Sequence, residues 1–127
     1  MSEISDKVNE REAAQGEQGQ RLLAAGERLR ADGKGSTFCD ALLSIAPGRI
    51  TFAVNQPRLA GGVAVTPAEV LHAMRFAFDH LKIVAEPGGA VALAAVLAGH
   101  VPARGRTVGV VISGGNVDPA VFARALA

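Results

Sequence analysis

This sequence of 127 residues lacks tryptophan and tyrosine and has a single cysteine, Cys39. One cysteine cannot form an internal disulfide, so the cytoplasm is the compartment that we expect. The net charge is only +1, which gives no electrostatic reason to expect nucleic acid or an anionic membrane as a partner. The most apolar stretch, residues 87–100, is too short to span a membrane. The polar, acid-rich start is unlike a targeting peptide.

Small and aliphatic residues are abundant instead. Hydrophobic residues make up 49% of the chain and are mostly alanine, valine and leucine, a composition that suits α/β layers. Roughly half of the charged residues fall in residues 1–34. Residues 1–19 have too few large apolar groups to offset chain entropy, so we expect a disordered tail there. Residues 20–127 then form one partial domain that begins with a helix over residues 20–31.

Three segments have the composition of strands. Residues 49–54 (RITFAV) and 63–66 are rich in β-branched side chains and predict short strands. Residues 106–112 (RTVGVVI) are a continuous apolar run, typical of a strand in a sheet that is covered on both faces. The fold class that we expect is α/β, a partial open parallel sheet with flanking helices. So few strands indicate part of a larger layered domain.

The clearest helix signal lies at residues 66–69 (TPAE). They combine an N-cap hydroxyl, a proline at the first helical position and a glutamate placed for a capping box. The helix is predicted to run to about Leu81. Its buried stripe contains four residues at helical spacing: Val70, Met74, Ala77 and Leu81.

Two further helices follow. Residues 90–97 carry no charge, which predicts a helix buried on all sides, with Gly99 as its C-cap. A last helix is predicted through Ala127, with residues 118–119 (DP) at its start.

The best candidate for a binding site is the segment 113–116 (SGGN), directly after the predicted strand 106–112. In open α/β sheets, ligands bind at the carboxyl ends of strands, and glycines let a ligand approach the backbone closely. A tight turn that happens to contain a serine explains the same residues equally well. Glu86, in residues 86–89 (EPGG), is the second candidate because negative charge is favoured at a helix N-terminus. A plain capping carboxylate is the alternative.

Two long segments together resemble a known family. Residues 80–99 (HLKIVAEPGGAVALAAVLAG) followed by residues 107–118 (TVGVVISGGNVD) resemble the end of the catalytic domain of threonine dehydratases and serine racemases. Residues 37–65 are similar to the stretch that precedes it in bacterial threonine dehydratases. The resemblance implies the C-terminal portion of a pyridoxal-phosphate (PLP) fold-type II domain. It also implies a lyase that converts L-threonine to 2-oxobutanoate and ammonia, or L-serine to pyruvate and ammonia.

The resemblance also implies roles for individual residues. Ser113 matches the serine that hydrogen-bonds the pyridine nitrogen of PLP, and Glu86 matches a glutamate near the ring. Gly114 and Gly115 match the turn against which the ring packs. Two more residues match positions near an effector nucleotide in serine racemases: Lys82 and Asn116.

The family's Schiff-base lysine and its phosphate-binding run of four glycines have no counterpart here. The three lysines are Lys7 in a polar tail, Lys34 in a glycine loop and Lys82 in an extended link. We therefore expect no catalytic residue in this chain and no activity from it alone. The metal-binding acids of the family would fall near residues 12–18, where this chain is polar but divergent, so we expect no metal site. Such a fragment is either a truncated gene product or one half of a split enzyme. The expected partner is an N-terminal half carrying the lysine, or a second copy in a homo-oligomer. A noncatalytic binding or regulatory module that retains the C-terminal half of the fold is the alternative.

Overall fold

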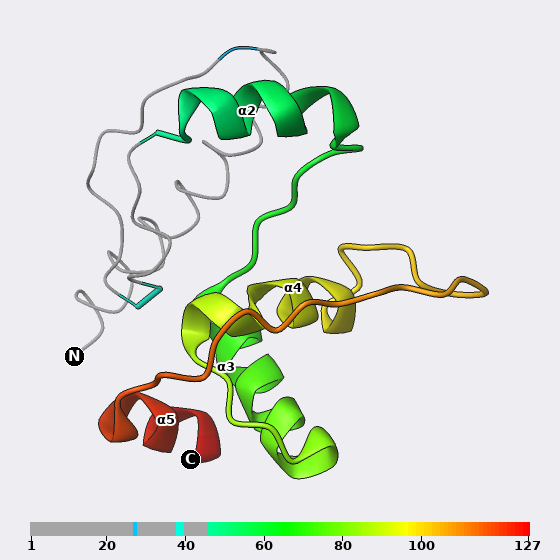
Figure 1. Ribbon diagram of the computed structural model, residues 1–127. Helices are drawn as coiled ribbons and strands as arrows, with labels where there is room; N and C mark the ends of the chain where they lie inside the picture. Colours follow the sequence, from blue (N-terminus) through cyan, green and yellow to red (C-terminus); the bar gives the residue numbers. More distant parts are fainter. Residues whose placement is uncertain (1–26, 28–37, 40–45) are drawn as a thin grey trace, which may run out of the picture. The chain divides into compact units, whose positions relative to one another are not determined.

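A computed structural model describes residues 27, 38–39 and 46–127 of the chain. The predicted tail over residues 1–19 and nearly all of the predicted helix over residues 20–31 lie outside the described residues. The chain divides into two units, Met1–Ala64 and Val65–Ala127 (Figure 1).

The described part of the first unit contains a short helix, α2 (Arg49–Asn55), and a 3-10 turn, η2 (Gln56–Arg58). The prediction of a strand over residues 49–54 is therefore wrong. None of the residues of α2 is buried, and Ile50 is 81% exposed. A strand gains from its β-branched side chains only when a neighbouring strand covers them, whereas a helix satisfies its backbone groups locally.

The second unit begins with helix α3 (Pro67–Phe76), which starts as the sequence predicts. The backbone N–H of Glu69 donates to Oγ1 of Thr66 at 3.3 Å, and the backbone N–H of Thr66 donates to Oε2 of Glu69 at 2.6 Å. The predicted capping box is confirmed. A π-helical turn, η3 (Ala77–Leu81), continues the helix to the predicted end.

The predicted stripe on this helix is correct for three of its four residues. Val70, Met74 and Ala77 are at most 1% exposed, but Leu81 is 47% exposed. The π-turn closes its hydrogen bonds over one more residue than an α-turn does. Leu81 is thereby rotated away from the face that carries the other three.

Helix α4 (Pro87–Leu97) packs against α3 and supplies the other half of a core made largely of alanine (Figure 1). Its buried residues include Ala90, Leu93 and Ala94. The prediction that the helix is buried on all sides is wrong in this chain, because Ala92 is exposed. Of the described helices, only α3 makes extensive contact with it. Gly99 follows the C-cap with a φ of 78°, as its predicted role requires.

Helix α5 (Pro119–Leu126) ends one residue before the predicted end. The side chain of Asp118 accepts a hydrogen bond from the backbone N–H of Ala120 at 2.7 Å, which confirms the predicted cap. Nη1 of Arg75 on α3 donates to the carbonyl oxygen of Leu126 at 2.7 Å. The rings of Phe78 and Phe122 meet edge to face, with centroids 5.5 Å apart. These contacts hold α5 against α3 and η3.

No strand occurs among the described residues, so the structure does not confirm the predicted sheet. Residues 63–66 and 106–112 have no regular hydrogen-bonding pattern. Figure 1 shows the second segment as part of the long orange run that leads to α5. A parallel strand requires a neighbouring strand to pair with.

Candidate functional site

The two predicted site segments meet in the structure. The backbone N–H of Glu86, the N-cap of α4, donates to the carbonyl oxygen of Gly114 at 3.0 Å. The two residues come from opposite ends of a loop that includes all of α4. This hydrogen bond places Ser113, the residue before Gly114, close to the start of α4.

The glycines at this crossing lie directly against other atoms of the protein. A Cβ on Gly89 would lie 2.5 Å from the carbonyl oxygen of Gly114, and one on Gly115 would lie 2.5 Å from the carbonyl oxygen of Val84. A Cβ on Gly114 would lie 2.5 Å from Oε1 of Glu86. The space beside each of these three glycines is therefore filled by protein atoms. Their close approach to a ligand remains a prediction.

The polar groups at the crossing are at least partly open to solvent. Ser113 and Asn116 are exposed, and Glu86 is half-buried. Within the described part of the chain, no side-chain hydrogen bond involves the Ser113 hydroxyl. This hydroxyl is thus available to a hydrogen-bond partner. A hydroxyl and a carboxylate beside a glycine turn fit the donor and acceptor needs of a pyridine ring with its phenolic oxygen.

Lys82 has a structural role of its own. It ends η3 with a left-handed backbone (φ 60°), and its Nζ donates to the carbonyl oxygen of Asp79 at 2.8 Å. No hydrogen bond between described residues joins it to Asn116. The proposed effector role of Lys82 and Asn116 remains a prediction.

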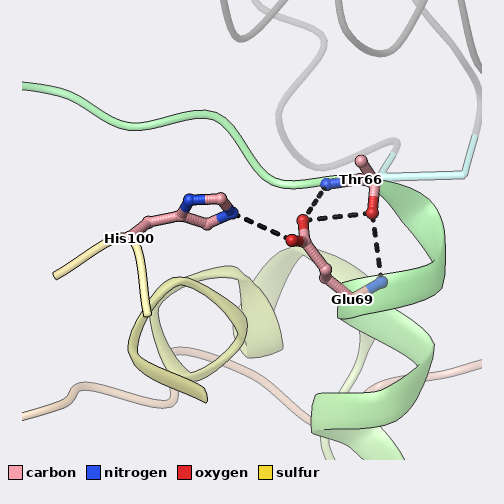
Figure 2. A network of polar contacts seen from close by, with 3 residues as sticks. All are labelled: Thr66, Glu69 and His100. Atoms are coloured by element: carbon pink, nitrogen blue, oxygen red, sulfur yellow. Dashed lines mark hydrogen bonds and ion pairs between the residues drawn. The ribbon is translucent and has the colours of Figure 1, made fainter. Parts of the chain in front are cut away.

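A second polar cluster lies at the other end of α4. Nε2 of His100 is 2.9 Å from Oε1 of Glu69, the glutamate of the capping box (Figure 2). The hydrogen bond from the backbone N–H of Thr66, followed by those from His100 and the Thr66 hydroxyl, lowers the pKa of Glu69 below its ordinary value of 4.5, although partial burial opposes the shift. The sequence predicts the cap but not this pair, because the two residues are 31 positions apart.

The same end of the unit has a shallow cavity of about 270 Å³ between α3 and α4. Its lining is mainly apolar, and none of the predicted cofactor residues contributes to it. The lining residues are Ala68, Glu69, His72, Ala94, Leu97 and Ala98.

The described residues contain neither a candidate metal site nor a candidate membrane-spanning helix. They contain no group of three or more histidine, cysteine, aspartate or glutamate residues that could hold a metal ion. None of the helices seen in this part of the chain is both long and apolar enough to cross a membrane.

The chain is similar in sequence to enzymes that act on amino acids. The chain is 37% identical to a serine racemase from Dictyostelium discoideum over 101 residues, which cover 77% of the chain and 31% of that protein. It is 38% identical to an L-threonine ammonia-lyase from Thermotoga maritima over 96 residues, which cover 76% of the chain and 23% of that protein. The chain corresponds to part of a threonine dehydratase and serine racemase family protein.

Solved structures of the family agree with this assignment. The crystal structure of a T.th. threonine deaminase matches 81% of the chain with a TM-score of 0.72 and 34% identity. The serine racemase from Dictyostelium discoideum matches 82% with a TM-score of 0.70 and 32% identity. The chain spans only 37% and 33% of these two dehydratase-family structures. No protein-family model matches the chain.

Proposed function

We propose that this chain forms the cofactor-ring side of a PLP-dependent lyase acting on a small hydroxy amino acid such as threonine or serine. The hydrogen bond between Glu86 and Gly114 carries the proposal, because it brings both predicted ring-binding segments to one place. The names of two relatives, an L-threonine ammonia-lyase and a threonine deaminase, support the reaction class.

In this proposal each site residue has a separate task. Bound PLP would supply the electron sink for removal of the proton at Cα of the amino acid. Ser113 would hydrogen-bond the ring nitrogen, and Glu86 would lie near the ring. A neutral hydroxyl cannot keep the ring nitrogen protonated as a carboxylate can. The weaker sink that results suits prompt β-elimination, which converts threonine to 2-oxobutanoate and ammonia.

The proposal also includes a part of the enzyme that this chain does not carry. None of the three lysines has the sequence context of the family's covalent lysine, and the run of four glycines is not in this sequence. Relatives extend well beyond the matched part. We therefore propose that this chain alone is inactive. A second polypeptide, which carries the lysine and the phosphate site, completes the enzyme in the cytoplasm.

The test combines the full chain with that missing part. The purified chain is assayed with PLP and L-threonine for 2-oxobutanoate, alone and together with Thermotoga maritima L-threonine ammonia-lyase from which the matched residues have been deleted. We expect no turnover from either component and measurable turnover from the mixture. Turnover by the chain alone, or none from a mixture that forms a complex, would contradict the proposal.

A matched pair of variants tests the ring contact. We expect Ser113→Ala to reduce turnover of the mixture by about 10-fold or more, since a hydrogen bond to the cofactor is lost. Thr51→Ala removes an exposed hydroxyl from α2 and should leave turnover unchanged. Equal turnover in both variants would remove Ser113 from the site.

A noncatalytic binding or regulatory module is the second candidate. Exposure of Ser113 and Asn116 without hydrogen-bond partners among the described residues fits a binding surface as well as half an active site. Such a module should bind PLP or a nucleotide alone, with no gain of turnover from the added lyase part. Calorimetric titration of the isolated chain distinguishes the two.

A further inference from the structure

Aliphatic side chains are exposed along the segment that leads into Ser113. Within residues 106–112, Val111 is 75% exposed and Val108 is 37% exposed. The segment before Glu86 exposes Ile83 and Val84 to 41% and 46%. Single exposed aliphatic residues are ordinary, but contiguous ones mark interaction surfaces.

The backbone of residues 107–112 has no hydrogen-bond partner among the described residues. Backbone donors and acceptors next to apolar side chains are normally paired in a folded protein. The sequence RTVGVVI is that of a strand buried on both faces. Its composition and its surroundings therefore disagree in this chain.

We propose that residues 106–112 dock a β-strand of the polypeptide carrying the rest of the dehydratase. We call these residues the edge, because the backbone groups of residues 107–112 have no hydrogen-bond partner among the described residues. This inference rests on the proposed function and adds the surface where the missing part binds. The chain spans between 23% and 37% of the relatives described above, so most of their length is left to supply that strand. A second copy of this chain would bring the same part again and would not complete a relative.

The edge leads directly into the candidate cofactor site, so a strand that docks there would also reach the site. Residues 106–112 continue directly into Ser113, whose neighbour Gly114 is bonded to Glu86. A strand paired alongside them in parallel would end beside the same turn. Groups that follow the docked strand would then face the Ser113 hydroxyl. Docking by strand addition would assemble the two sides of the site in one step.

The first test uses the full chain without a partner. Hydrogen exchange followed by mass spectrometry should show rapid exchange for the amides of residues 107–112 and slow exchange within α3 and α4. Slow exchange of residues 107–112 in a monomeric sample would show that the chain covers the edge itself, and slow exchange only in a dimer would show that a second copy does. Either result would overturn the proposal.

The second test measures docking directly. The tagged Thermotoga maritima L-threonine ammonia-lyase lacking its matched residues is co-expressed with the full chain, and the complex is quantified by co-purification and ultracentrifugation. We expect a one-to-one complex in which the amides of residues 107–112 exchange at least about 10-fold more slowly.

Two lysine substitutions make the test specific to the edge. Val111→Lys puts a charge on the proposed edge and should reduce the yield of complex about 10-fold or more, because an unpaired charge is unfavourable in a buried contact. Ile50→Lys changes a side chain of similar exposure, 81%, on α2 and should have no effect. Equal yields from the two variants would place the contact elsewhere.

Different results would contradict the proposed docking surface and the proposed lyase function. A complex that is lost in Val111→Lys but shows no turnover supports the edge and contradicts the lyase function. Turnover that is lost in Ser113→Ala but unaffected by Val111→Lys supports the function and contradicts the edge.

Discussion

Nε2 of His100 lies 2.9 Å from Oε1 of Glu69, so the glutamate of the capping box at the start of α3 also binds the loop that follows α4. One carboxylate therefore serves the start of one helix and the end of another (Figure 2).

Acid should weaken this connection. The pKa of Glu69 is lowered in the folded chain, chiefly by the backbone N–H of Thr66, so its ionised form stabilises the fold. That contribution is complete above the unfolded value near 4.5 and is lost as the pH falls through the folded pKa. Urea unfolding between pH 6 and pH 3 should show the loss. Glu69→Gln should be less stable at pH 6, with a smaller further loss on acidification. An unchanged pH profile would contradict this role.

Gly89 and Gly115 at the crossing should tolerate alanine less well than Gly109, which lies outside it. In Gly89→Ala and Gly115→Ala the new Cβ would meet backbone oxygen atoms, so we expect each to cost about 1–3 kcal/mol in free energy of unfolding. Gly109→Ala, where nothing lies within 4 Å, is the control and should change little. Thermal denaturation followed by circular dichroism measures all three. Equal midpoints would show that the crossing is looser than described.

At position 82, glycine should be less destabilising than alanine. Its φ of 60° is unfavourable for a residue with a Cβ by about 1–2 kcal/mol. Both substitutions remove the hydrogen bond from Nζ to Asp79, so only the backbone term separates them. We expect Lys82→Gly to be more stable than Lys82→Ala by about 1 kcal/mol in chemical denaturation. The reverse order would argue against a left-handed cap at this position.

Met74 should be the most sensitive large side chain of the core. It is fully buried between α3 and its neighbours, and Met74→Ala should cost about 2–5 kcal/mol in free energy of unfolding. Ile50→Ala, at a side chain that is 81% exposed, should stay within about 0.5 kcal/mol. Comparable losses in both would mean that the core is not where the structure places it.

The structural features that the sequence predicted correctly are local ones. The capping box of Thr66 and Glu69, the cap at Asp118 and the glycine after α4 each depend on residues within a few positions of one another. Such contacts form whatever the rest of the chain does. The resemblance to the dehydratase family predicts two site segments, and the hydrogen bond between Glu86 and Gly114 joins them. Their contact with a cofactor stays a prediction.

Expectations that depend on distant partners fared worse. Residues 49–54 form a helix rather than a strand, and residues 106–112 have no strand to pair with among the described residues. Leu81 is exposed because a π-turn changes the phase of the helix, which periodicity alone does not reveal. The contact between His100 and Glu69 joins residues too far apart in sequence for spacing to suggest it.

The contact between Gly114 and the Glu86 carboxylate also constrains how such proteins can diverge. A side chain at position 114 would collide with the flexible end of Glu86 rather than with backbone, so the fold could accept it once the glutamate moved or shortened. Positions 86 and 114 should therefore change together during evolution. Descendants that lose glycine at position 114 are expected to carry a shorter or neutral residue at position 86, and to have given up the placement of that carboxylate with it.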